Sequence, residues 1–165
     1  MEKIEWIRDL VMSEQKLEEE GLIDLSIEQS FGLDLNRESL SYIRDLKTQF
    51  IETAAAFNQL KGGAEGSVKI YGISGSKADF MLFRNGYKLI FALKEAGTLS
   101  IRFHSVGSFV PSGSGLPNDF DKNEALIHAT IGPFGDLTWK YQGQDVKIEN
   151  LVRYYFTRFI KESKK

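Results

Sequence analysis

The sequence predicts an α+β fold, in which one antiparallel sheet of about five to seven strands is covered on one face by two helices. Apolar residues recur at helical spacing over about 37–61 and again over about 149–163. A two-residue alternation fills much of the chain between them. A sheet with an apolar face must bury that face, so we expect both helices to pack against it.

Length and composition are those of an ordinary globular protein. The 165 residues include 42% hydrophobic and 27% charged side chains, which suits one domain, or one domain with an appendage. No stretch approaches the roughly 20 apolar residues of a membrane span, and the first residues lack the order of a secretory signal. We therefore expect a soluble, cytoplasmic protein with no membrane partner. The lack of cysteine excludes disulfides and a cysteine nucleophile.

The net charge of −2 is unevenly distributed along the chain. Residues 1–30 carry nine acidic and three basic side chains, so residues 31–165 carry a net charge of +4. Apolar spacing predicts a helix over 2–19, and the alternation in LIDLSIEQ, residues 22–29, predicts a short edge strand or an extended arm. We divide the chain into an acidic N-terminal helix with its arm, residues 1–30, and a single α+β domain, residues 31–165.

The two helices of the domain each carry one apolar stripe. In the long helix the stripe consists of Leu40, Ile43, Leu46, Phe50, Ala54 and Phe57. In the C-terminal helix it consists of Leu151, Val152, Tyr155, Phe156, Phe159 and Ile160. Asn36 is a suitable N-cap for the long helix, and Gly62-Gly63 follow its end. These stripes predict two helices that bury one side against the sheet.

Asn85-Gly86, between two apolar runs, predicts a tight hairpin whose register is fixed by a two-residue turn. The pairs expected are Arg84 with Tyr87, Phe83 with Lys88, Leu82 with Leu89, Met81 with Ile90, and Phe80 with Phe91. The length of the next connection follows from the requirement that apolar residues of neighbouring strands lie on the same face of the sheet. A three-residue loop, Glu95–Gly97, keeps apolar residues on one face, whereas a two-residue turn would place Lys94 beside Leu99. The pairs expected from it are Leu93 with Leu99, Phe91 with Ile101, Leu89 with Phe103, and Lys88 with His104.

The rest of the sheet follows in the C-terminal half. The segments EALIHATI and LTWKY read as two strands, and a turn at Gly132–Gly135 separates them. Val146 and Ile148 predict a further short strand before the final helix. These strands would extend the sheet beyond the two hairpins.

The longest irregular segment is GSFVPSGSGLPNDFDKN, residues 107–123. Loops longer than roughly 12–15 residues in compact domains are usually functional or disordered. Phe109 and Phe120 are candidate binding residues here, because apolar anchors would let the loop dock on the domain as a lid or rim. Disorder at its Gly-Ser centre is the alternative.

The predicted register yields a basic surface on the face that points away from the core. The residues expected to face the core are Phe80, Leu82, Leu89, Phe91, Ile101 and Phe103. Those expected on the opposite face are Asp79, Met81, Phe83, Lys88, Ile90, Ala92, Lys94, Ser100, Arg102 and His104, joined by Thr138 and Lys140 if Trp139 and Leu137 point inward. The candidate binding residues are Lys88, Lys94, Arg102, His104, Phe83 and Lys140. Cations with apolar contact area suit an anionic ligand or an acidic protein, although basic strand faces also serve solubility.

Two other kinds of chemistry find little support. The segment YGISGSKADF resembles a phosphate-binding loop in composition, but Gly72 and Gly75 are too close together and Ala78 stands where a hydroxyl is needed. His104 and His128 are the only histidines, and both are expected on the polar face of strands. Candidate carboxylates such as Asp119 and Asp121 lie in the long irregular segment. No metal, cofactor or catalytic residue is predicted.

The sequence therefore predicts a non-catalytic binding or accessory module that engages an anionic ligand or acidic protein partner through its basic sheet face. Two alternatives remain open. One is a small-molecule or hydrolytic enzyme with a pocket between sheet and helices, which a histidine beside a carboxylate in that pocket would favour. The other is a nucleic-acid binder, which is disfavoured because Phe83 is the only stacking aromatic predicted on the face.

Overall fold

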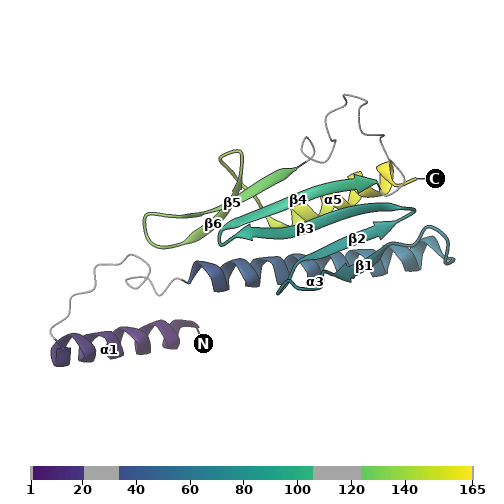
Figure 1. Ribbon diagram of the computed structural model, residues 1–165. Coiled ribbons are helices and arrows are strands. Elements are labelled where there is room, and N and C mark those ends of the chain that lie inside the picture. Colours follow the sequence, from purple (N-terminus) through teal and green to yellow (C-terminus); the bar gives the residue numbers. More distant parts are fainter. Residues whose placement is uncertain (1, 21–33, 106–123, 165) are drawn as a thin grey trace. The chain divides into compact units, whose positions relative to one another are not determined.

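The computed structural model describes residues 2–20, 34–105 and 124–164 (Figure 1). The chain divides into two compact units, Met1–Leu35 and Asn36–Lys165. The first, the N-terminal unit, contains helix α1 (Glu2–Glu20), in agreement with the helix predicted there. The strand or arm predicted over 22–29 lies outside the described residues. The second, the C-terminal unit, contains the sheet and the two long amphipathic helices of the α+β fold.

The sheet has seven antiparallel strands, each hydrogen-bonded to the next in sequence, and it is not closed into a barrel. The strands are β1 (Lys69–Gly72), β2 (Phe80–Arg84), β3 (Tyr87–Glu95), β4 (Thr98–Ser105), β5 (Ala125–Ile131), β6 (Leu137–Tyr141) and β7 (Gln144–Asp145). This confirms the predicted α+β class with an antiparallel sheet. The strands follow one another as a meander, so the described turns between neighbouring strands lie at the ends of the sheet.

Helices α3 (Leu35–Lys61) and α5 (Ile148–Glu162) lie along the sheet on the same side, as Figure 1 shows. Both predicted helices are therefore confirmed. Their buried residues join one hydrophobic core with the inward-facing residues of the strands. Three phenylalanine rings form its centre: Phe91 is 4.8 Å from both Phe80 and Phe50, measured between ring centroids. Phe103, predicted to face the core, packs at its edge and is half-buried.

The register between β2, β3 and β4 agrees with the prediction at every predicted pair. The connection between β3 and β4 differs in one detail. Glu95 pairs with Thr98, so the turn has two residues, and a bulge between Leu93 and Glu95 takes up Lys94. A bulge places one extra residue on a strand, so a two-residue turn can keep the faces matched. Gly97 adopts a left-handed backbone, with a φ of 83°, which glycine tolerates without strain.

The short last strand lies two residues earlier than predicted. Gln142 and Gly143 have φ values of 50° and 79°, and this left-handed turn sets Gln144 opposite Tyr141. Val146 lies after the strand, and its backbone N–H donates to the Trp139 carbonyl over 2.8 Å. Ile148, expected in the strand, begins α5 instead. The turn chemistry of Gln142-Gly143, rather than the apolar alternation, therefore sets this strand.

Arg84 is a buried cation on the core side of the sheet, a position that the sequence analysis did not single out. Its Nε donates to the Gly66 carbonyl over 2.7 Å, and its Nη1 donates to the Ile160 carbonyl over 3.1 Å. The Ile160 carbonyl lies in the last turn of α5, where the helix dipole favours a positive charge. Arg84 therefore ties β2 to the end of α5 and to the segment between α3 and β1.

Candidate functional site

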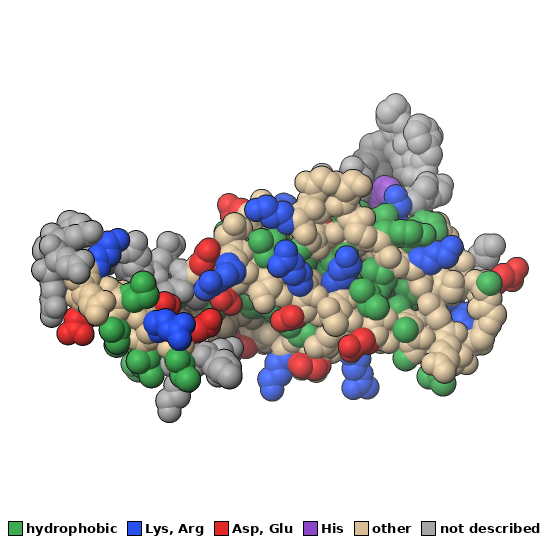
Figure 2. All heavy atoms as spheres, turned by 90° about the horizontal axis from the view of Figure 1, so that it is seen from below, with side chains coloured by type: hydrophobic (Ala, Val, Ile, Leu, Met, Phe, Trp, Pro, Cys, Tyr) green, Lys and Arg blue, Asp and Glu red, His purple; other side chains and the backbone are tan. Residues whose placement is uncertain are grey.

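The candidate site is the outer face of the sheet, which points away from α3 and α5. Within the described residues of the C-terminal unit, both long helices cover the opposite face. Both histidines of the chain lie on outer-face strand positions. Figure 2 shows a face of the molecule on which hydrophobic side chains gather among lysine and arginine side chains, close to a histidine. The outer face is thus both basic and apolar.

Strand pairing brings the outer-face residues into two adjacent rows across β1, β2, β3 and β4. One row is Lys69, Phe83, Lys88 and His104, and the other is Tyr71, Met81, Ile90 and Arg102. We call these eight residues the basic–apolar patch. Neighbouring strands lie about 4.8 Å apart, so the members of each row are adjacent. The rings of Tyr71 and Phe83 meet edge to face, with 6.4 Å between their centroids.

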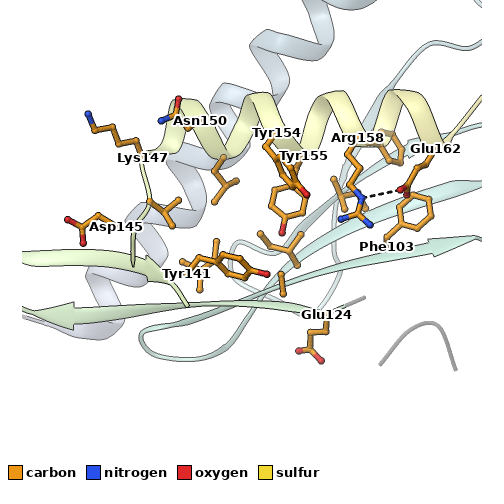
Figure 3. Close-up of a pocket in the computed structure, with 17 residues that line it drawn as sticks. Phe103, Glu124, Tyr141, Asp145, Lys147, Asn150, Tyr154, Tyr155, Arg158 and Glu162 are labelled. Atoms are coloured by element: carbon orange, nitrogen blue, oxygen red, sulfur yellow. Dashed lines mark hydrogen bonds and ion pairs between the residues drawn. The ribbon is translucent and has the colours of Figure 1, made fainter. Parts of the chain in front are cut away.

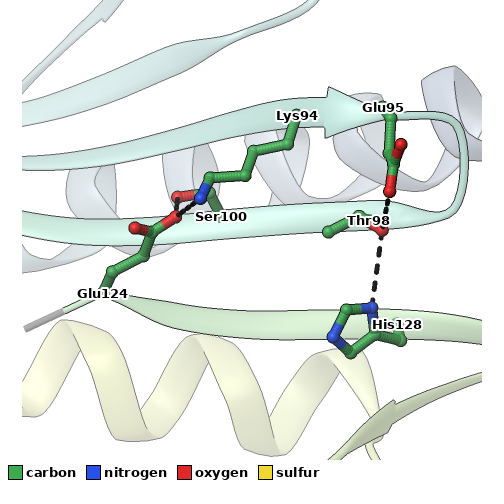
Figure 4. A network of polar contacts seen from close by, with 6 residues as sticks. All are labelled: Lys94, Glu95, Thr98, Ser100, Glu124 and His128. Atoms are coloured by element: carbon green, nitrogen blue, oxygen red, sulfur yellow. Dashed lines mark hydrogen bonds and ion pairs between the residues drawn. The ribbon is translucent and has the colours of Figure 1, made fainter. Parts of the chain in front are cut away.

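The other end of the outer face also carries cations, but each is paired with a carboxylate. The ammonium of Lys94 lies 2.5 Å from a Glu124 oxygen, which also accepts a 2.9 Å hydrogen bond from the Ser100 hydroxyl (Figure 4). Lys140 lies 3.8 Å from the Asp145 carboxylate. We call Lys94, Ser100, Glu124, Lys140 and Asp145 the compensated end. The Lys94 and Ser100 hydrogen bonds, in that order, lower the pKa of Glu124, so it stays ionised at neutral pH.

The structure therefore separates the predicted binding residues into two groups. Phe83, Lys88, Arg102 and His104 come together in the basic–apolar patch. Lys94 and Lys140 lie at the compensated end. Lys94 lies six positions after Lys88 along β3, which corresponds to roughly 20 Å. The two loop candidates, Phe109 and Phe120, lie outside the described residues.

Sequence reasoning missed three residues that shape this surface. Lys69 and Tyr71 enter the basic–apolar patch from β1, and alternation in the segment VKIYG was the signal that could have placed them. Glu124 compensates Lys94 across the sheet. No local pattern indicates that contact, because Glu124 follows the long irregular segment and its pairing is fixed only by the fold. Tyr71 also gives Phe83 an aromatic neighbour, which the sequence analysis did not expect.

The two histidines do not assemble a hydrolytic site. His104 faces Lys88 in the basic–apolar patch. At the other end, the Thr98 hydroxyl oxygen lies 3.4 Å from His128 Nδ1 and 3.5 Å from a Glu95 oxygen (Figure 4). In a hydrolytic triad the imidazole stands between the acid and the hydroxyl, so that it can accept the proton of the nucleophile. Here the hydroxyl stands in the middle, and the arrangement cannot activate it in that way.

The glycine-rich segment after β1 forms a turn between antiparallel strands. The Ser76 backbone N–H donates to the Ile73 carbonyl over 3.3 Å, and Gly75 has a φ of 83°. A phosphate-binding loop would instead lead into the N-terminus of a helix. Among the described residues, no group of three or more His, Asp or Glu side chains is placed to hold a metal ion. None of the helices in the described ranges has the length and apolar character needed to cross a membrane.

No protein-family profile matches the sequence, and no curated protein or solved structure is significantly similar to the chain.

Proposed function

We propose that the protein is a binding module whose basic–apolar patch engages an acidic protein segment that also carries apolar side chains. The observation that supports this most directly is the position of Lys69 and Lys88. The two lysines lie in one row on either side of Phe83, on a face that the long helices leave open. Neither makes an ion pair with another described residue, in contrast to Lys94 and Lys140.

The charge of the patch selects an anionic partner. Charges on exposed strands add little to stability, so the two lysines are available for a partner without weakening the fold. Complementary charge mainly increases the association rate and sets specificity, and this contribution falls as salt screens it. A partner with carboxylates is therefore expected to bind fastest at low ionic strength.

The apolar part of the patch gives the contact its affinity. Tyr71 is 45% exposed, and Met81, Phe83 and Ile90 are half-buried beside it. Aromatic side chains supply contact area at little entropic cost and are enriched at protein interfaces. A partner that offers apolar side chains between its carboxylates would bury this surface, whereas a purely acidic chain would not.

The two alternative functions differ from this one in what they require. The hydrolytic alternative predicted from the sequence places a histidine beside a carboxylate in the pocket under α5, and neither His104 nor His128 lines that pocket. A single-stranded nucleic acid would need stacking surfaces along a basic track. Tyr71 and Phe83 supply two rings in edge-to-face contact rather than a series of parallel platforms. We therefore favour a protein partner, and the binding experiment includes a nucleic acid for comparison.

The test measures binding of four labelled ligands to the full chain by fluorescence anisotropy. The ligands are an acidic peptide that alternates Glu with Leu or Phe, the same peptide with Ser at the apolar positions, the same peptide with Lys in place of Glu, and an oligonucleotide of equal charge. We expect the acidic, apolar peptide to bind at least about tenfold more tightly than the other three. Equal binding of the oligonucleotide would instead indicate a general polyanion surface, and preference for the Lys peptide would refute the proposal.

A further inference from the structure

A pocket lies under α5 on the core side of the sheet, separate from the outer face. Its volume is about 750 Å³, and it is lined by residues of α5 and of strands β3 to β7 (Figure 3). Sites for small molecules usually measure about 300–1,000 Å³ and combine an apolar lining with a few polar groups. The size of this pocket therefore suits a small organic ligand.

The interior of the pocket is apolar. Its strand side is formed by Leu89, Ile101, Phe103 and Ile127, and Leu151 and Phe159 contribute from α5. Most of these residues also belong to the hydrophobic core, so a ligand here would contact the core directly. Burying apolar surface contributes about 25 cal/mol per Å², so the body of the ligand is expected to be apolar.

Three tyrosines give the pocket its hydrogen-bonding groups. Tyr154 and Tyr155 point from α5 toward the strands, and Tyr141 approaches from β6, as Figure 3 shows. Burial, reinforced by the neighbouring Tyr141 and Tyr154 hydroxyls, raises the pKa of Tyr155 to about 12. Its hydroxyl therefore keeps its proton at neutral pH and can donate a hydrogen bond to an anion.

The charges around the pocket favour an anionic ligand. Glu124 is paired with Lys94, and Figure 3 shows its carboxylate pointing away from α5. Asp145 lies beside Lys140, and Glu162 accepts a 3.0 Å hydrogen bond from Arg158 Nε. Each carboxylate that lines the pocket thus has a cation beside it. Lys147, in contrast, has no ion pair among the described residues. The lining alone has three acidic and two basic side chains, but Lys94 and Lys140, which pair with two of those acids from outside the lining, bring the net charge of the region to +1.

Arg158 is the side chain best placed to receive an acid group. It leaves α5 on the same side as Tyr155, and its guanidinium reaches toward the strands in Figure 3. Its Nε is occupied by Glu162, while a guanidinium has two further nitrogens that can donate to one carboxylate. The Arg158–Glu162 pair is half-exposed and lies within one helix, so it is a weak competitor for a ligand.

We propose that this pocket binds a small amphipathic carboxylic acid, with its apolar body against the strand residues and its carboxylate at Arg158 and the Tyr155 hydroxyl. This site is independent of the basic–apolar patch, because the two lie on opposite faces of the sheet. The ligand class follows from an apolar interior, protonated phenol donors, and the cations Arg158 and Lys147 in a lining whose carboxylates are all paired.

Isothermal titration of the full chain with three matched amphiphiles below their micelle concentrations tests the ligand class. The probes are dodecanoate, dodecanol and dodecylammonium, which share one apolar chain and differ in charge. We expect dodecanoate to bind at least about fivefold more tightly than dodecanol, and dodecylammonium to bind most weakly. Equal affinities, or a preference for dodecylammonium, would overturn the proposal.

Four variants locate the site. Arg158→Gln should weaken dodecanoate binding about fivefold and leave dodecanol binding unchanged, whereas Arg153→Gln, an exposed change on the same helix, should alter neither. Glu162→Gln should strengthen dodecanoate binding, because it frees Arg158. Ala125→Trp should fill the pocket and reduce binding of all three probes at least tenfold. No change with Arg158→Gln, or weaker binding with Glu162→Gln, would overturn the proposal even if Ala125→Trp failed to fold.

The variant Lys88→Gln distinguishes ligand binding in the pocket from binding at the basic–apolar patch. It changes the basic–apolar patch and should leave dodecanoate affinity within twofold of the wild type. Loss of dodecanoate binding in Lys88→Gln would show that the anion binds the outer face and would refute the pocket as its site.

Discussion

The ammonium of Lys94 lies 2.5 Å from the Glu124 carboxylate, and this contact joins the bulge at the end of β3 to the start of β5. Ser100 donates to the same carboxylate from β4, the strand between them. The contact neutralises one of the cations expected to form a binding surface. The outer face therefore has a compensated end, where Lys94 and Lys140 are paired with carboxylates, and the basic–apolar patch, where Lys69 and Lys88 have no ion pair with a described residue.

The first prediction concerns the pH dependence of this contact. The pKa of Glu124 is lowered in the folded protein, so its contribution to stability is present above the unfolded pKa of about 4.3 and is lost as pH falls through the folded pKa. Glu124→Gln should therefore reduce the free energy of unfolding by about 0.2–1 kcal/mol at pH 7. The deficit should shrink as pH falls below the unfolded pKa. Urea titrations at several pH values measure it, and a deficit that does not change as the pH is lowered would contradict the ion-pair explanation.

The second prediction compares the centre and the edge of the core. Phe91 is fully buried between Phe50 and Phe80, so Phe91→Ala should cost about 3–5 kcal/mol of unfolding free energy. Phe103 is half-buried beside the pocket, so Phe103→Ala should cost clearly less, about 1–2 kcal/mol. Lys88→Ala on the outer face should cost less than about 0.5 kcal/mol. Chemical denaturation ranks the three, and a different order would show that the faces are wrongly assigned.

The third prediction concerns Arg84. Arg84→Met keeps an apolar stem but leaves the half-buried carbonyls of Gly66 and Ile160 without this donor, so we expect a loss of about 2–4 kcal/mol. Arg153→Met, an exposed change on α5, should cost less than about 0.5 kcal/mol. Thermal or urea unfolding compares the two. Similar small effects would mean that water replaces the guanidinium at those carbonyls.

The fourth prediction concerns the N-terminal unit. A chain that begins at Asp34 keeps α3 complete and retains the C-terminal unit with its whole described core. It should unfold in one cooperative transition with a free energy within about 0.5 kcal/mol of the full chain. Circular dichroism during urea titration measures this, and loss of the cooperative transition would show that residues 1–33 are integral to the fold.

Much of the fold could be predicted from the sequence because local chemistry determines it. Asn85-Gly86 fixes one hairpin, and continuity of the apolar face then fixes the strand after it. The bulge at Lys94 could not be predicted, because a bulge with a two-residue turn and a longer loop give the same register. Ile148 was expected in the last strand rather than in α5, because two apolar residues at alternate positions fit a strand as well as a helix entry.

The candidate site was predictable only where it depends on alternation within neighbouring strands. Phe83 and Lys88 were placed together because the hairpin turn pairs them. The pairing of Lys94 with Glu124 was not predictable, because those residues are far apart in sequence and no turn relates them. A pocket between sheet and helices was considered from the sequence, but the residues that line it were not predicted. Several of its polar groups are tyrosines, which also fit the apolar stripe of a helix.

The central claim is that the basic–apolar patch, rather than the overall charge of the outer face, binds an acidic partner. The most direct measurement compares the affinity of two double variants for the acidic, apolar peptide. One variant combines Lys69→Gln and Lys88→Gln in the patch, and the other removes the same charge by combining Lys94→Gln and Lys140→Gln at the compensated end. The patch variant should bind the peptide at least about tenfold more weakly than the wild type, and the other less than about twofold more weakly, because its lysines are already paired. Equal losses, or a greater loss in the second variant, would contradict the account.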